Sequence, residues 1–189
     1  MKKTLALFLL LLPFQLTYSQ IHGGSERTLF FRNGDSLICK GYYNLKKQQF
    51  VIPDSITKKK VKYDYRTISH VKWIDGSIGY FKIISGKNIP QLMGLEKKGK
   101  LNLYGITYST YGSVHGGASG GGIIYYIGKD ESSNATNLRD KPNGFRLPFK
   151  KYASEYFSDC PELVEKISNG EFKHKHLPEI VDFYNAHCN

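Results

Sequence analysis

The sequence has few of the residues that supply cross-links, metal ligands or negative charge. It contains three cysteines, so one internal disulfide can form and one thiol is left over. Acidic residues are scarce, 16 against 27 lysines and arginines, which gives a formal net charge of +11. Beyond the N-terminal segment, no apolar run approaches the roughly 20 residues that a membrane-spanning helix needs. We therefore expect a basic protein without a transmembrane helix after its N-terminal segment.

The N-terminal segment has the parts of a secretory signal peptide. Two lysines follow the initiating methionine, an apolar stretch covers residues 5–13, and small residues precede Gln20. No cysteine follows the expected cleavage point, which argues against a lipoprotein anchor. We predict a signal peptide over 1–19 and a mature chain of 20–189 that forms a single domain. Its expected location is the periplasm, the outer-membrane surface or the medium.

The middle of the chain has the pattern of an antiparallel β-sheet. Aromatic and β-branched residues occur in short runs separated by glycine-containing turns. Asn33-Gly34 and Asp75-Gly76 are typical of tight hairpin turns, and Lys98-Gly99 separates two further runs. The expected strands are 28–31, 36–42, 61–65, 71–74, 78–84, 91–96, 101–108 and 123–127. The glycine-rich residues 109–122 and the polar residues 128–144 are expected to be loops.

The end of the chain predicts three short helices. Apolar residues recur at helical spacing in three groups: Phe149, Tyr152, Ala153, Tyr156 and Phe157; Leu163, Val164 and Ile167; Leu177, Ile180, Val181 and Tyr184. Asp159 and Glu162 have the spacing of a capping box at the start of the second helix. We predict an α+β fold, with a β-rich part at 26–130 rolled into a small barrel or sandwich and a helical part at 148–187.

The three cysteines differ in their surroundings. Cys160 opens the second predicted helix and Cys188 follows the third. If these helices run antiparallel across their short link, the two thiols lie close together, and export places them in an oxidising compartment. We predict a Cys160–Cys188 disulfide. Cys39 lies in an apolar run and is expected to be a buried free thiol.

Three serine motifs match those of hydrolases by letter. Residues 117–121 read G-A-S-G-G and match G-x-S-x-G, but the helix that should follow the serine is missing. Residues 34–37 spell the signature of the GDSL hydrolases, but they lie in a predicted hairpin turn and no Asp-x-x-His occurs. Residues 55–58 match S-x-x-K without a partner K-T-G motif. A serine hydrolase that uses Ser119 is kept as the alternative function.

Histidines near the C-terminus have the chemistry of a zinc site: His174, His176 and His187, together with Cys188. A polar link between two helices beside a disulfide explains the same residues more simply. We therefore expect no metal site and no cofactor.

Lysines cluster at 58–60, 97–100 and 173–175. Export argues against nucleic acid as the partner of this charge. Lipid headgroups, an anionic polysaccharide or an envelope protein would fit a basic surface better, although charged hairpin tips explain the lysines as well. Tyr108, Tyr111 and His115 lie in or beside the glycine-rich stretch. They are the candidate ligand-binding residues, because tyrosine rings can stack on sugars.

Several segments carry a resemblance to a known family. They are the Tyr-Ser-Gln end of the signal, the strand sequence of 29–35, the Lys-Gly-Lys-Leu of 98–101 with Tyr104, and above all the Y-F-S-D-C-P-E-L of 156–163 leading to Phe183-Tyr184-Asn185 and Cys188. In these segments the chain resembles a family of uncharacterised exported proteins of Bacteroidota. The resemblance implies an envelope or secreted location and brings no catalytic residues. We expect a non-enzymatic exported protein that acts by binding.

Overall fold

The computed structural model describes residues 25–54, 56, 57, 59–84, 90–110, 120–129, 132–139 and 148–188. The strands are β1 (Arg27–Phe31), β2 (Ser36–Cys39), β3 (Tyr42–Asn44), β4 (Gln49–Pro53), β5 (Lys60–Asp64), β6 (Ile68–Trp73), β7 (Ile78–Ile84), β8 (Gln91–Lys97), β9 (Leu101–Thr110), β10 (Gly120–Lys129) and β11 (Asn134–Ala135). The helices are α1 (Phe149–Tyr156), α2 (Pro161–Ser168), the 3-10 turn η1 (His174–His176) and α3 (Leu177–His187). The predicted signal peptide lies outside these residues and stays a prediction.

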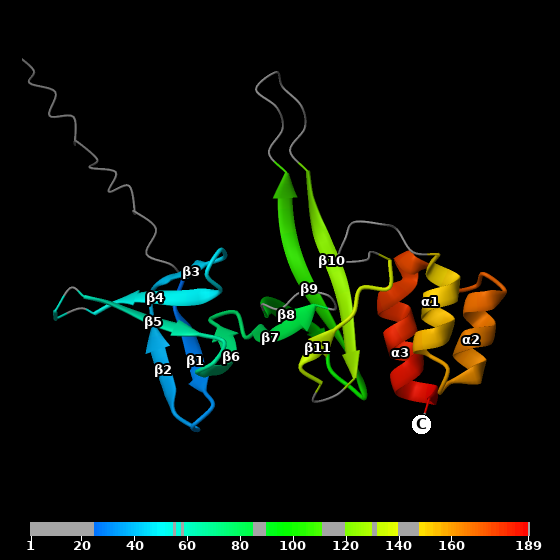
Figure 1. Cartoon of the computed structure of the whole chain (residues 1–189), viewed down its shortest axis with the longest axis horizontal. Coiled ribbons are helices and arrows are strands. Elements are labelled where there is room, and N and C mark those ends of the chain that lie inside the picture. Colours follow the sequence, from blue (N-terminus) through cyan, green and yellow to red (C-terminus); the bar gives the residue numbers. More distant parts are fainter. Residues whose placement is uncertain are drawn as a thin grey trace, which may run out of the picture.

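The strands form two antiparallel sheets. The large sheet has the order β10-β9-β8-β7-β6-β1-β2, and β11 adds a short parallel pairing to β7. The small sheet has the order β3-β4-β5. The helices follow at the opposite end of the molecule from the small sheet (Figure 1). This arrangement confirms the predicted α+β fold, with antiparallel sheets first and three helices last.

The small sheet packs against the N-terminal part of the large one. Their shared core contains Leu29 of β1, Phe50 of β4, Val71 of β6 and Phe81 of β7, all buried. The rings of Tyr43 and Phe50 pack at a tilt of 41° with their centroids 4.8 Å apart. Two sheets packed face to face over apolar side chains make this end of the molecule a small sandwich.

The two predicted hairpin turns are confirmed. Gly34 and Gly76 have φ angles of +94° and +85°, which only glycine adopts without strain. They connect β1 to β2 and β6 to β7 in antiparallel pairs. The Lys98-Gly99 turn likewise connects β8 to β9.

Some predicted boundaries are wrong. A single strand was expected over 36–42, but the chain leaves the large sheet after Cys39 and enters the small one at Tyr42. The crossing brings Gly41 against β4, where a Cβ would lie 2.5 Å from the carbonyl oxygen of Val51. The expected loop of 109–122 also begins and ends in strand, because β9 and β10 pair as far as Thr110 and Gly120.

β4 was not predicted at all, because its sequence shows no clear alternation. Phe50 and Val51 are adjacent and both buried, which departs from the period of two that marks a half-buried strand. The expected loop of 128–144 contains the end of β10 and the short strand β11. The missing alternation misled the prediction at β4, and polar composition misled it over 128–144.

The helices pack on the β9–β10 hairpin. A second core joins Leu101 and Leu103 of β9 and Ile127 of β10 to buried residues of all three helices. These helical residues are Ala153, Phe157, Leu163, Ile167, Leu177, Ile180, Val181 and Tyr184. Each of them belongs to an apolar group that the sequence pattern predicted. None of the helices described is long and apolar enough to cross a membrane.

Asn185 ties α3 to the start of β9. Its Oδ1 accepts a hydrogen bond from the backbone N–H of Leu101 (2.8 Å), and its Nδ2 donates one to the Leu101 carbonyl oxygen (2.9 Å). The amide thus pairs with the strand as a neighbouring strand would. Gly99 leaves the room for it, since a Cβ there would lie 2.4 Å from Asn185 Nδ2.

The predicted capping box is wrong. Cys160 is the N-cap residue of α2, without a side-chain hydrogen bond. Asp159 instead accepts hydrogen bonds from Lys129 Nζ (2.6 Å) and Tyr184 Oη (2.7 Å). Burial raises the pKa of Asp159, but these two hydrogen bonds outweigh it, so the pKa lies below its usual value. Asp159 therefore links α3 to β10.

His70 of β6 provides a test of the aromatic packing on the large sheet. It stacks on Phe30 with centroids 4.3 Å apart and lies 5.6 Å from Tyr80, and burial lowers its pKa below 6.5. Below about pH 6.5 the unfolded chain therefore binds more protons at this residue than the folded one, so acidification costs stability. We expect the melting temperature to fall less between pH 7 and pH 5 in His70→Phe than in wild type. An unchanged fall in the variant would contradict this assignment.

Candidate functional site

Three glycines form a row across the middle of the large sheet. Gly79 of β7 pairs with Gly94 of β8, and Gly94 pairs with Gly105 of β9. A glycine weakens a strand, because it has no side chain to pack, and it often marks a place where a ligand or another backbone comes close. With strands about 4.8 Å apart, the row is about 10 Å long. The glycines contribute no side chains to this strip of the sheet, and neighbouring side chains cover its two ends but not its middle at Gly94.

Trp73, the single tryptophan of the chain, stands at the β7 end of this row. Val71 of β6 pairs with Gly79. Trp73 is two positions after Val71 in the same strand, so its side chain lies on the face of the sheet that Val71 and Gly79 share. A Cβ built on Gly79 would lie 2.3 Å from Cη2 of the indole. The ring therefore occupies the space above Gly79, and glycine is required there because a side chain would displace it.

Glu96 stands at the β9 end of the row. Leu95 pairs with Tyr104 and Lys97 with Leu103, so Glu96 is the extra residue of a β-bulge. Bulges turn a side chain in a new direction and are frequent beside functional sites. A Cβ on Gly105 would lie 2.9 Å from Glu96 Oε1, which places the carboxylate beside the glycine row.

A groove of about 490 Å³ runs between these two side chains, and we call it the glycine groove. Gly94 and Gly105 line it, with Trp73 and Leu92 as apolar neighbours. Its residues with polar side-chain groups are Tyr43, Asp75, Ser77, Glu96 and Thr107. An apolar, aromatic wall with a few polar groups is the usual composition of a small-molecule site.

The carboxylate of Asp75 is held in its ionised form. The Ser77 hydroxyl donates a hydrogen bond to Asp75 Oδ1 (2.6 Å), and the Ser77 backbone N–H donates another (2.9 Å). These bonds lower the pKa of Asp75. An ionised carboxylate only accepts hydrogen bonds. With Glu96 at the other end, the groove offers acceptors to hydroxyl donors and repels anions.

A second cleft, of about 710 Å³, lies at the β1–β2 hairpin. Arg32, Asp35, Ser36, Tyr63 and Thr67 are among its lining residues. Ser36 is the serine of the GDSL-like motif, and no histidine occurs among the lining residues that the structure describes. The motif therefore lies in a hairpin, as predicted, and the described lining of the cleft supplies no histidine as the base that such a hydrolase requires.

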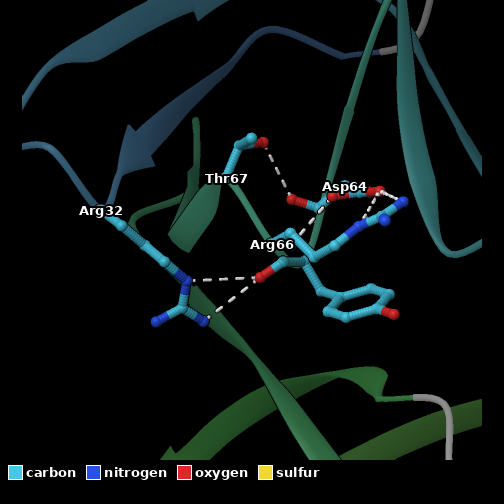
Figure 2. A network of polar contacts seen from close by, with 5 residues as sticks. Arg32, Asp64, Arg66 and Thr67 are labelled. Carbon is cyan, nitrogen blue, oxygen red and sulfur yellow. Dashed lines mark hydrogen bonds and ion pairs between the residues drawn. The ribbon is translucent and has the colours of Figure 1, made fainter.

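Arg32 and Asp35, the charged residues that line this second cleft, already have internal partners: Asn33 Nδ2 donates a hydrogen bond to Asp35 Oδ2 (2.6 Å). Figure 2 shows the contacts of Arg32 and of the adjacent β5–β6 turn. Arg32 donates from Nε (3.3 Å) and Nη2 (3.2 Å) to the carbonyl oxygen of Tyr65. Arg66 forms a two-pronged ion pair with Asp64, and the Thr67 hydroxyl donates to the Asp64 carbonyl oxygen. These contacts hold the β5–β6 turn against the β1–β2 hairpin. We assign them a structural role and favour the glycine groove as the site.

The predicted site residues have different outcomes. Ser119, Tyr111 and His115 lie outside the described residues, so the hydrolase alternative stays a prediction. Tyr108 is on β9 and 46% exposed, but it is not among the residues that line the glycine groove. Its ring lies beside Gly122 of the neighbouring strand, since a Cβ there would be 3.0 Å from Tyr108 Oη.

The cysteine predictions are confirmed. Cys160 and Cys188 form a disulfide with Cα atoms 5.4 Å apart. Cys39 is a buried free thiol, and burial raises its pKa although Arg27 acts in the opposite direction. The disulfide removes Cys188 from the set of zinc ligands that the sequence suggested. Within the described ranges, no three His, Cys, Asp or Glu residues are placed to hold a metal ion.

The residues of the glycine groove were missed at the sequence level. The sequence shows glycines at 79, 94 and 105, each inside a predicted strand, where they weaken the pattern. Their meaning depends on register, because only the pairing of three strands brings them into one row. The one signal in the sequence was the occurrence of a glycine inside each of three successive predicted strands.

Comparison of the chain with models of protein families, with curated proteins and with solved structures found no match.

Proposed function

We propose that this protein is a non-enzymatic, exported binding protein, and that the glycine groove binds an uncharged saccharide chain. The row formed by Gly79, Gly94 and Gly105 between Trp73 and Glu96 is the observation that carries the proposal. A flat, hydroxyl-rich ring needs an open floor, an aromatic side chain to stack on and acceptors at its rim. The groove combines all three.

The charges of the residues that line the glycine groove restrict the class of ligand that it can bind. Asp75 and Glu96 both line the groove, whereas none of the lining residues described is a lysine or arginine. An anionic polysaccharide would bring its negative charges against these carboxylates, which is unfavourable. Hydroxyl groups, in contrast, donate hydrogen bonds to carboxylates at short range. We therefore favour a neutral saccharide over the acidic one considered at first.

The state of Asp75 suits ligand binding better than proton donation. Glycoside hydrolysis needs one carboxylic acid with a raised pKa to protonate the leaving oxygen. The pKa of Asp75 is instead lowered by the hydrogen bonds from Ser77. This carboxylate therefore suits ligand binding and does not suit proton donation.

Export is the second part of the proposal. The signal-like N-terminus supports it, and so does the disulfide between Cys160 and Cys188, since such bonds persist in oxidising compartments. The resemblance to exported proteins of Bacteroidota points to the same location. Detection of the mature protein outside the cytoplasm, with its N-terminus at Gln20, tests this part separately from the ligand.

Because Trp73 is the only tryptophan, its fluorescence reports the groove without background. We expect titration with a panel of uncharged oligosaccharides, built from glucose, N-acetylglucosamine or mannose, to shift the Trp73 emission for at least one of them. The same saccharide should be recovered uncleaved. Tyr108→Ala, an exposed aromatic outside the groove, is the matched control and should bind as wild type does. No spectral response to any of the saccharides, or release of shorter products, would contradict the proposal.

A further inference from the structure

The β4–β5 hairpin ends in an exposed apolar residue. Ile56 is 89% exposed, the largest value among the exposed large hydrophobic residues of the described chain. Hydrogen bonds made by Asp54 fix the backbone on both sides of it. Asp54 Oδ1 accepts hydrogen bonds from the backbone N–H groups of Ile56 and Thr57, both at 2.8 Å, and the Asp54 N–H donates to the Lys59 carbonyl oxygen (2.8 Å). Asp54 thus holds the backbone at Ile56 and Thr57.

Lysines surround this apolar tip. Lys59, Lys60 and Lys62 are exposed on or just before β5, which is an edge strand of the small sheet. Val61, between the last two, is 39% exposed. The only described carboxylate at the tip is Asp54, and it accepts the N–H groups of the turn. The hairpin therefore combines uncompensated positive charge with exposed apolar side chains.

Positive charge is also concentrated in the part of the chain that carries this hairpin. Residues 25–84 contain twelve lysines and arginines against five acidic residues. Residues 148–188, which hold the helices, contain five against seven. In Figure 1 the β4–β5 hairpin extends outward at one end of the molecule and the helices lie at the other. The protein is thus electrically polarised along its long axis, with the hairpin at the positive end.

From this combination we infer that the β4–β5 hairpin attaches the protein to an anionic phospholipid bilayer. The lysines would be drawn to the negative surface, each contributing about fivefold in affinity. Ile56 would enter the boundary between headgroups and acyl chains, contributing about tenfold. An acidic polysaccharide would satisfy the lysines alone and leave the exposed isoleucine unexplained. This site is independent of the glycine groove and does not rest on the proposed function.

Flotation with lipid vesicles tests the inference. We expect the protein to bind vesicles of phosphatidylcholine that contain phosphatidylglycerol, and not vesicles of phosphatidylcholine alone. Lys59→Gln, Lys60→Gln and Lys62→Gln combined should lower the affinity about a hundredfold. Ile56→Ser should lower it about tenfold, whereas Ile74→Ser should leave it unchanged. Ile74 is the matched control, because it is 76% exposed and precedes the β6–β7 turn.

Insertion itself can be observed. In the double variant Trp73→Phe, Ile56→Trp, the only indole is at the tip, and its emission should shift to shorter wavelength on anionic vesicles. No shift, equal binding to both kinds of vesicle, or equal weakening by Ile74→Ser would overturn the inference. Binding to heparin without binding to anionic vesicles would also overturn it, since the lysines would then serve an acidic polymer.

Discussion

Replacement of Cys160 and Cys188 by serine is expected to lower the free energy of unfolding by about 3–4 kcal/mol. The two residues are 28 positions apart, so the bond closes a loop that contains α2, η1 and α3. Without the bond, the unfolded chain gains the conformational freedom of that loop. The folded state should change little, because the helices remain packed through buried residues such as Phe157, Leu163 and Ile180.

Denaturant unfolding of wild type, with and without reductant, and of the double serine variant measures this effect. The oxidised protein should unfold at the highest denaturant concentration, and the reduced protein should match the variant. Cys39→Ser is the control, because that thiol is free, and reductant should still destabilise the protein that carries it. If reductant has no effect on the unfolding of wild-type protein, the bond does not stabilise the helical part.

Local patterns were sufficient to predict the helices and hairpins. The apolar groups of 149–187 depend only on helical spacing, and the turns at Gly34 and Gly76 depend on adjacent residues. The disulfide was predicted from the expected antiparallel arrangement of the second and third helices. Asp159 shows the limit of such patterns, because its capping spacing was present but Lys129 and Tyr184 compete for its carboxylate.

The glycine groove could not be predicted in the same way. Its floor depends on the pairing of β7, β8 and β9, and a slip of one residue would move every side chain to the other face. The bulge at Glu96 is also a property of the paired strands and has no mark in the sequence. The sequence had directed attention to Tyr108, an exposed aromatic beside a glycine-rich stretch, whereas Trp73 looked like an ordinary strand residue.

Gly94→Val is expected to weaken saccharide binding more than a hundredfold while the fold is kept. A Cβ at Gly94 has ordinary contacts, 3.6 Å to Glu96 Oε1 and 3.7 Å to the Gly105 carbonyl oxygen. Valine also suits a strand better than glycine, so stability should stay the same or rise by about 0.5–1 kcal/mol. Its methyl groups, however, would fill the floor between Trp73 and Glu96. The variant therefore separates occupancy of the groove from stability.

Neighbouring glycines explain why position 94 is the one to change. At Gly79 a side chain would displace Trp73, with a Cβ only 2.3 Å from the indole. At Gly105 it would lie 2.8 Å from Ile123 Cγ2, so a loss of binding there would be confused with a change in packing. Gly122→Val, in β10 and outside the groove, is the matched control. The three atoms nearest to a Cβ at Gly122 all belong to the side chain of Tyr108, which is exposed and can move.

Calorimetric titration of wild type, Gly94→Val and Gly122→Val with the saccharide that shifts the Trp73 emission tests the groove most directly. We predict that wild type and Gly122→Val release the same heat with the same affinity, and that correctly folded Gly94→Val shows no measurable binding. Wild-type affinity in Gly94→Val would show that the ligand does not lie on the glycine row, and the proposed function would be wrong.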